Sequence, residues 1–215
     1  QVNTITKKYD SDSMVIGEGP CTKDLITITD KDFKTVSVVS IAAIFIIIIC
    51  VFKSAVLPIV LVAAIEFAIF INMCLPYYLN TTIPFISSVV IGTIQLGATV
   101  DYAILMTTRY RKERFEGASK KEAISIALST SIPSVIVSAL GFFAATFGVG
   151  VYSSVDMIGS LCTLMARGAI ISMFVVIFIL PSFFVVFDKI IIHTSKGFID
   201  KSRKIKAVNP EVTNI

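Results

Sequence analysis

The chain has 215 residues, of which 55% are hydrophobic and 16% charged, and its mean hydropathy is +0.85. This composition excludes an ordinary soluble globular protein and is typical of a membrane protein. The formal net charge of +4 comes from basic loops and a basic tail, so we interpret it as attraction to anionic lipid rather than to nucleic acid.

The first 34 residues are largely polar and precede every long apolar run. Thr, Ile and Val alternate there, and residues 17–21 (GEGPC) resemble a turn, so we expect one or two strands from the end of an extracytoplasmic α/β domain. Such a short piece cannot bury a core by itself. Since the chain starts at Gln1 and no leader-like segment precedes this stretch, we expect a fragment of a longer protein.

Five apolar runs approach or exceed the roughly 20 helical residues that cross about 30 Å of hydrocarbon. Pro181 lies late in the last run and predicts a kink or an end there. The sequence therefore predicts an all-α membrane protein with a five-helix bundle over residues 36–188, after an extracytoplasmic remnant (1–35) and before a basic tail (189–215). The runs are Val36–Phe52, Ala55–Leu79, Ile83–Thr108, Ile124–Val151 and Val155–Phe187.

Lysine and arginine gather in alternate connections between these runs. They lie after the first, third and fifth runs, whereas residues 76–84 and 148–156 contain none. Short cytoplasmic loops carry an excess of such residues, so we expect the N-terminal segment outside and the tail in the cytoplasm. The composition is compatible with a plasma membrane.

Asp101 is the most informative residue, because a carboxylate inside an apolar run is costly unless it handles ions or protons or meets a partner. At about 100° per residue, one helical face collects Ile94, Gly97, Ala98, Asp101, Ile104, Leu105 and Thr108. The small Gly97 and Ala98 let another helix approach closely, so we expect Asp101 to face a helix rather than lipid. It is our candidate proton carrier; the alternative is a structural acid held by a basic partner.

No cofactor or metal site is expected. The cysteines show no disulfide or metal-ligand spacing, and the single histidine, His193, has no partner ligands beside it. No phosphate-binding glycine loop or nucleophile motif is present, so we expect neither an enzyme nor a pump that hydrolyses ATP on this chain.

Three segments resemble signatures of one family. Residues 97–117 (GATVDYAILMTTRYRKERFEG) resemble the Gly-rich, Asp-Tyr, then Arg-Tyr-Arg signature on a central helix of the MMPL branch of the resistance-nodulation-division (RND) transporters. Residues 52–58 (FKSAVLP) are similar to the family's Phe-Arg-Ser-Leu-x-x-Pro turn, and residues 180–188 (LPSFFVVFD) resemble the Leu-Pro ending of its last helix. Their order and spacing make the resemblance specific.

The resemblance implies a transporter of two pseudo-symmetric halves, each with one helix, a large outside domain and five more helices. This chain would be the end of the second outside domain and the last five helices. Proton flow would drive export of lipids, hydrophobic compounds or peptides. The implied partners are the N-terminal half of the transporter, the bilayer and a hydrophobic or lipid substrate; a homo-oligomer stays open.

The resemblance also suggests companions for Asp101. Tyr102 would donate its phenol to a carboxylate on the facing half, and Ser138 is similar to hydroxyl positions along the family's relay. From the residues alone, Tyr102 could equally be ordinary packing, and serine in a membrane helix usually bonds its own backbone.

Depth decides which other polar residues could join Asp101. At 1.5 Å per residue, Asp101 lies about 12 Å and Glu66 about 18 Å above the inner surface, whereas Arg167 lies about 31 Å from the inner end. Glu66 could therefore join the proton path or bond a neighbouring helix, but we expect no direct pair between Asp101 and Arg167. Asn72 and Gln95 are predicted to join helices to one another.

Two other functions need weighing. A non-pumping lipid- or sterol-sensing scaffold can use a related five-helix bundle, and unchanged export in an Asp101→Asn variant would favour it. An intramembrane aspartyl protease needs two carboxylates sharing a water, and only Glu66 could supply the second acid.

Overall fold

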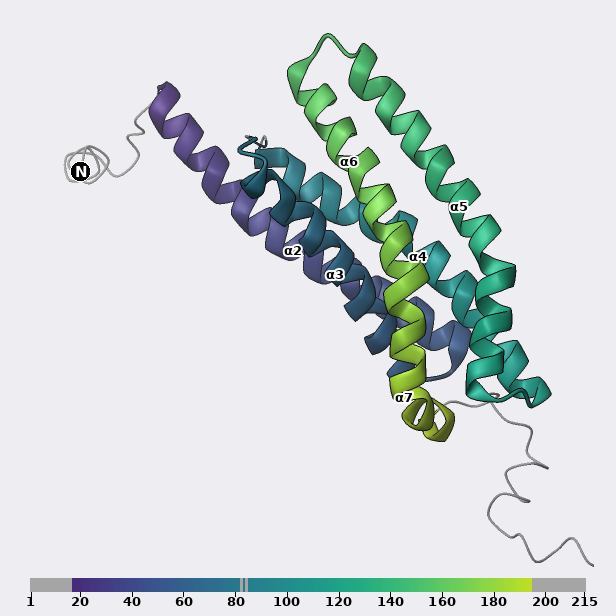
Figure 1. The fold of residues 1–215 in the computed structure, drawn as a ribbon. Helices are drawn as coiled ribbons and strands as arrows, with labels where there is room; N and C mark the ends of the chain where they lie inside the picture. Colours follow the sequence, from purple (N-terminus) through teal and green to yellow (C-terminus); the bar gives the residue numbers. More distant parts are fainter. Residues whose placement is uncertain (1–16, 82, 84, 195–215) are drawn as a thin grey trace, which may run out of the picture.

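The computed structural model describes residues 17–81, 83 and 85–194. The described residues form long helices and no strand, and five segments are long and apolar enough to cross a membrane, which confirms the all-α prediction and the number of spans. Figure 1 shows these helices side by side in an elongated bundle. The elements are α2 (Glu18–Phe52), α3 (Val56–Tyr78), α4 (Phe85–Glu116), α5 (Lys120–Tyr152), α6 (Asp156–Phe174), the π-helical segment η1 (Val175–Ile179) and α7 (Leu180–Thr194).

The strand prediction for the N-terminal stretch is wrong from residue 18 onward, because α2 begins at Glu18. Gly17 precedes it at φ 153°, and the acidic Glu18 in the first turn suits the positive end of the helix dipole. Threonines that suggested a strand bond within the helix instead: Thr22 and Thr27 donate to carbonyls four residues earlier. Residues 1–16 and the tail beyond 194 lie outside the described part.

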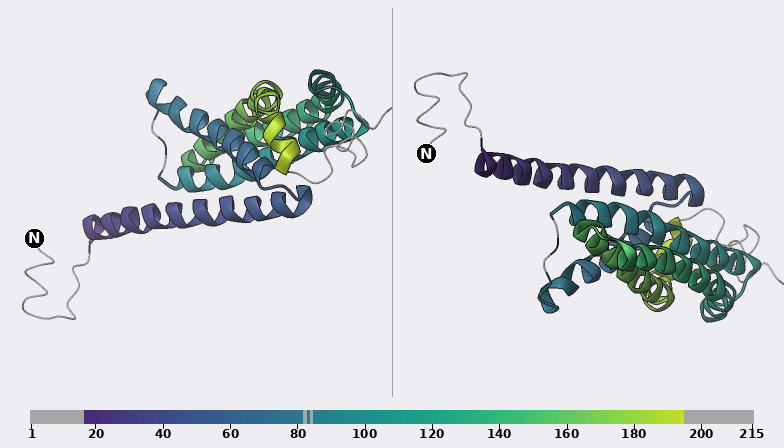
Figure 2. Two further views of the ribbon diagram at one scale, coloured as in Figure 1. Left: turned by 90° about the horizontal axis from the view of Figure 1, so that it is seen from below. Right: turned by 90° about the horizontal axis from the view of Figure 1, so that it is seen from above.

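Helix α2 is much longer than the predicted first span. Its 35 residues extend about 52 Å, whereas the hydrocarbon is about 30 Å thick. The charged N-terminal part therefore continues beyond the bilayer as helix. Figure 2 shows α2 lying along one side of the bundle, with its N-terminal part projecting past the other helices.

Helix α3 lies at the centre of the packing and contacts α2, α4, α6, η1 and α7. Its inward-facing positions are filled by aliphatic side chains of the core, including Leu57, Leu61 and Ile65. Because the core occupies the interior between all the helices, α3 has the largest buried share of its apolar span. The other helices leave broad faces uncovered by this chain.

Pro181 coincides with a change in helix geometry, as predicted for a kink. The peptide N–H of Leu180 donates to the carbonyl of Val175, five residues back. A proline ring clashes with the carbonyl four residues earlier and supplies no N–H, and the wider π turn accommodates both effects. The helix does not end there: α7 continues to Thr194 and is seen nearly end-on in Figure 1.

The basic connections lie at one end of the bundle, which we call the basic end. There, Lys53 ends α2 in the left-handed conformation at φ 50°. Gly117, at φ 98°, turns the chain between α4 and α5. Ser119 then caps α5 by accepting a hydrogen bond from the N–H of Glu122, a pair with the spacing of a capping box.

Candidate functional site

Asp101 lies in the middle of α4, and its side chain is exposed. It forms no hydrogen bond or ion pair with a described residue. Among the residues predicted to share its face, Ile94, Gly97 and Thr108 are also exposed. Ile104 and Leu105, at the edge of this face, pack against the core, so the described chain leaves only the part of the face around Asp101 uncovered. The expectation that Asp101 meets another helix therefore requires a partner from outside this chain.

The two small residues before Asp101 behave in the same way. Gly97 is exposed, and a Cβ atom added to it would meet nothing within 4 Å. Ala98 is half-buried. Neither supports close helix packing inside the described chain, and their predicted role stays a prediction about contacts with a further helix.

Tyr102 points differently from its neighbour. Its side chain is 8% exposed and belongs to the core cluster, because one residue step on a helix rotates the side chain by about 100°. Packing inside this chain covers most of the Tyr102 side chain, which fits the interpretation of Tyr102 as ordinary packing.

Glu66 on α3 is half-buried and lines a pocket of about 330 Å³ between α2, α3 and α4. Gly92 and Leu96 supply the α4 side of this pocket, and Asp101 follows Leu96 by five residues, about 7.5 Å along the axis. No described contact joins Glu66 to Asp101. Ser138 is exposed on α5 and likewise forms no hydrogen bond with Glu66 or Asp101.

Buried amides link three helices in the part of the bundle away from the basic end. Asn72 on α3 donates to Gln95 on α4 at 2.8 Å, and Gln95 donates to the hydroxyl of Ser172 on α6 at 3.0 Å. Thr99 on α4 donates to the same Ser172 oxygen at 2.8 Å. The prediction that Asn72 and Gln95 join helices is confirmed.

Arg167 on α6 completes this network. Its Nε donates to Asn72 Oδ1 and its Nη2 to the main-chain carbonyl of Asn72, both at 2.9 Å. It does not contact Asp101, as the depth argument predicted. The adjacent Gly168 gives the two amides room: a Cβ atom there would lie 2.7 Å from both Asn72 Nδ2 and Gln95 Oε1.

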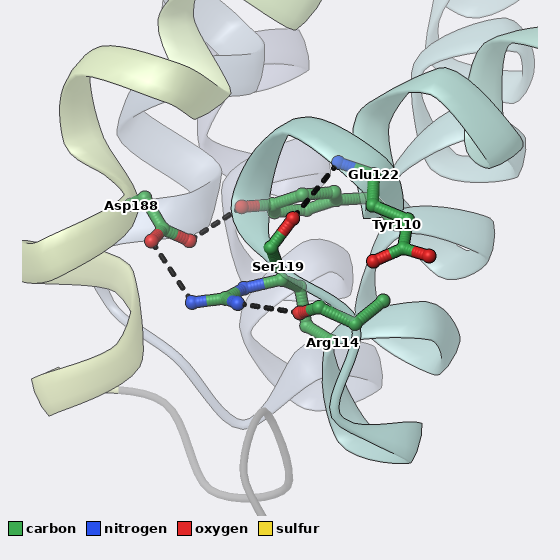
Figure 3. Close-up of polar contacts among 6 residues, drawn as sticks. Tyr110, Arg114, Ser119, Glu122 and Asp188 are labelled. Atoms are coloured by element: carbon green, nitrogen blue, oxygen red, sulfur yellow. Dashed lines mark hydrogen bonds and ion pairs between the residues drawn. The ribbon is translucent and has the colours of Figure 1, made fainter.

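A second cluster lies at the basic end (Figure 3). The carboxylate of Asp188 on α7 has two partners on α4. It accepts a hydrogen bond from the Tyr110 hydroxyl and forms an ion pair with Arg114 Nη2 at 3.0 Å. Arg114 Nη1 also donates to the carbonyl of Ala118 at 2.8 Å. Asp188 and Tyr110 are buried, and the Tyr110 ring stacks on Phe184 with centroids 5.0 Å apart.

The sequence argument treated residues 109–114 only as a basic anchor and did not foresee this cluster. A signal was present, because Arg114 and Asp188 lie in two of the three family-like segments. Their pairing was not readable from spacing, since 74 residues separate them. The described residues contain no cluster of His, Cys, Asp and Glu suited to a metal ion.

The chain is similar to curated membrane proteins. "Putative membrane protein YdgH" of Bacillus subtilis is 27% identical over 146 residues, which cover 64% of this chain and 16% of that protein. "Putative membrane protein ActII-3" of Streptomyces coelicolor is 23% identical over 165 residues, 75% of this chain and 23% of that protein. No solved structure matches the chain.

The chain thus spans less than a quarter of either curated relative. The MMPL family matches residues 2–207, which include all the described helices and all three segments that resembled its signatures. The chain belongs to the MMPL family.

Proposed function

We propose that this chain is the C-terminal half of a membrane exporter driven by the proton-motive force, with Asp101 as the proton carrier. The observation that carries the proposal is the part of α4 around Asp101, which the described chain leaves uncovered. Asp101 and Gly97 are exposed there, in the middle of a membrane span, with nothing from the described chain against them.

A carboxylate facing hydrocarbon is costly, so its face needs a protein or water partner. The curated relatives are at least four times longer than the matched segment, and a further bundle in the same protein is a natural partner. The small Gly97 permits close approach of a helix from that half. Asp101 would then lie between two halves, where it can exchange protons with water.

The remaining relay candidates have different support. Ser138 is exposed on α5 and is available to a partner on the uncovered side. Tyr102 is mostly enclosed by this half, so it would act by positioning α4 and Asp101. Glu66 lines the pocket between α2, α3 and α4, and we propose that it assists proton transfer without being the main carrier.

The proposal also implies an orientation in the membrane and a class of cargo. The basic end would face the cytoplasm and the opposite end the outside, in a plasma membrane, according to the positive-inside rule. The cargo would be a lipid, another hydrophobic compound or a peptide, and a homo-oligomer stays open. An enzymatic role has little support, because Glu66 and Asp101 share no contact that would let two carboxylates hold one water.

One observation favours a second candidate, a lipid-binding scaffold that does not pump. The pocket between α2, α3 and α4 is lined mostly by apolar residues such as Ile41, Phe70 and Leu96, and it has a volume suited to part of a lipid or sterol. Such a protein would bind lipid without needing Asp101 to change its protonation.

The deciding experiment is export by the full-length parent in proteoliposomes with a proton gradient and a fluorescent lipid cargo. We expect Asp101→Asn to lower both cargo export and coupled proton flux by at least tenfold, because the amide cannot carry a proton. Thr108→Val, on the same exposed face, is the matched control and should retain both activities.

Equal amounts of folded protein must be compared, with thermal unfolding as the check. Retained export in a folded Asp101→Asn protein would remove the proton carrier from the mechanism and favour the scaffold. Lost export with unchanged cargo binding would support the transporter.

A further inference from the structure

A pocket of about 580 Å³ lies at the end of the bundle opposite the basic end. It is lined by residues 79, 81 and 83, which follow α3, by Gly150 near the end of α5 and Ser153 just after it, and by the first three turns of α6. The α5–α6 connection marks this end in Figure 1. The pocket is separate from Asp101 and from the Glu66 pocket, since no lining residue is shared.

Close packing of α5 on α6 shapes the pocket. A Cβ atom on Gly159 would lie 3.3 Å from the carbonyl of Gly150, and one on Gly150 would lie 3.1 Å from Thr163 Oγ1. The two helices are therefore nearly in backbone contact at their connection. The hollow lies beside that contact and has both polar and apolar lining residues.

Arg167 supplies the positive charge in this lining. Two of its nitrogens are committed to Asn72, but Nη1 has no hydrogen bond to a described residue and is not among the buried unpartnered atoms. Asn72 is neutral, and Arg167 forms no ion pair with a described residue. A half-buried guanidinium in a membrane span without a counter-charge is costly.

The depth of Arg167 suits the boundary between headgroups and hydrocarbon. It follows Asp156 by 11 positions, about 16 Å of helix, in an apolar segment of 33 residues or about 50 Å. A segment of this length centred on about 30 Å of hydrocarbon extends about 10 Å beyond it at each end. The backbone of Arg167 therefore lies roughly 6 Å inside the hydrocarbon, and its long side chain can reach the interface.

We propose that this pocket binds the anionic group, a carboxylate or phosphate, of an amphiphile from the adjoining leaflet. Arg167 Nη1 would donate to the anion. The hydroxyl of Ser160, which also lines the pocket and has no hydrogen bond to a described residue, would be a second donor. Leu79 and Ile83 offer apolar surface to the adjoining acyl chain. Guanidinium pairs strongly with both kinds of anion.

Asp156, in the first turn of α6, is the acid in the lining. It lies about 16 Å of helix from Arg167, so it disfavours multiply charged ligands more than a single anionic group. A ligand that carries an ammonium group next to its anion could place that ammonium near the Asp156 carboxylate. The Asp156→Asn variant should therefore bind a purely anionic lipid about two-fold more tightly, since the Coulomb term is screened at that distance.

The test uses the full-length parent in phosphatidylcholine nanodiscs, titrated with fluorescent phosphatidic acid. We expect Arg167→Gln to weaken binding at least tenfold. Since that change also removes the bonds to Asn72, Ser160→Phe is the second variant: it fills the pocket, leaves Arg167 in place and should weaken binding comparably. Ile158→Phe, exposed on the same helix and outside the pocket, should bind as the wild type does.

Unchanged binding in folded Ser160→Phe would overturn the proposal even if Arg167→Gln failed to fold. A competition arm separates lipid from soluble anions. If millimolar inorganic phosphate displaces the probe, the ligand is a soluble anion and not an amphiphile. If a neutral-lipid analogue binds equally well, the pocket does not recognise the anionic group, and the proposal is wrong. Binding is measured without a proton gradient, so this result is independent of whether Asp101 drives transport.

Discussion

Gly168 illustrates how one residue without a side chain supports a polar network. It occupies the point where α6 passes the paired amides of Asn72 and Gln95. Both amides are buried, so each needs its hydrogen-bond partners to offset the loss of water. A glycine lets the amide pair lie against the α6 backbone, where Gln95 also reaches the Gly168 carbonyl at 3.4 Å.

We predict that Gly168→Ala destabilises the protein by about 1–3 kcal/mol, the usual cost of leaving buried polar groups unpaired. The new Cβ would lie 2.7 Å from an atom of each amide, and either amide can move only by leaving its partners. Unfolding of the purified protein in mixed micelles with added SDS measures the change in free energy.

Gly141→Ala is the control, because a Cβ atom at Gly141 meets nothing within 4 Å. It should be neutral or slightly stabilising, as alanine is the better helix former. Equal stability of both variants would show that the amide network adapts to the added methyl group without loss.

Helices α4 and α7 are joined at the basic end by one acid with two partners. Asp188 accepts from both Tyr110 and Arg114, so the last helix is fixed to the helix that carries Asp101. A buried carboxylate keeps its charge only when such partners surround it.

We predict that Arg114→Met costs about 3 kcal/mol, because it leaves the Asp188 carboxylate buried without its cation. The side chains of this pair are 14% and 7% exposed. The pair of Lys112 with Glu116, on the same helix, is 63% and 56% exposed, and Lys112→Met should change stability by less than about 0.5 kcal/mol.

The same SDS titration in mixed micelles compares the two variants. Because removing Asp188 as well takes away the uncompensated charge, the double variant Arg114→Met with Asp188→Leu should recover part of the loss. If the two single variants prove equally stable, Asp188 finds other partners and the link between α4 and α7 is weak.

The molecule as a whole is a bundle with a covered centre and uncovered flanks. Half of the α3 span is buried, the largest share of any span, whereas α2, α5 and the Asp101 face of α4 expose more of their apolar and polar residues. In a membrane, lipid can cover the apolar surface, but it cannot satisfy the carboxylate of Asp101. The shape therefore supports a partner bundle on the α4 side.

Orientation in the membrane gives a prediction for the entire bundle. Single cysteines would be placed at Ser154, in the connection after α5, and at Lys120, the first residue of α5. The parent would have its other cysteines replaced. We expect a membrane-impermeant maleimide to label position 154 in intact cells and position 120 only after permeabilisation, since short basic loops stay in the cytoplasm. The reverse pattern would invert the proposed topology.

Several properties followed from the sequence alone because they depend on local composition. Run lengths predicted five spans, and the bilayer thickness makes such counting reliable. A lone acid in an apolar run marked Asp101 as costly, and two isolated amides predicted bonds between helices. The failure of strand prediction from residue 18 onward has a local cause too: alternating Thr, Ile and Val also fits a helix whose threonines bond their own backbone.

The tertiary structure alone decided which distant residues meet. Arg114 and Asp188 are 74 positions apart, Asn72 and Arg167 are 95 apart, and no periodicity encodes such pairs. It also separated Tyr102, in the core, from Asp101, on the uncovered face. Local pattern fixes helix and face, whereas helix crossing and side-chain reach determine contacts, and these depend on the packing of the entire bundle.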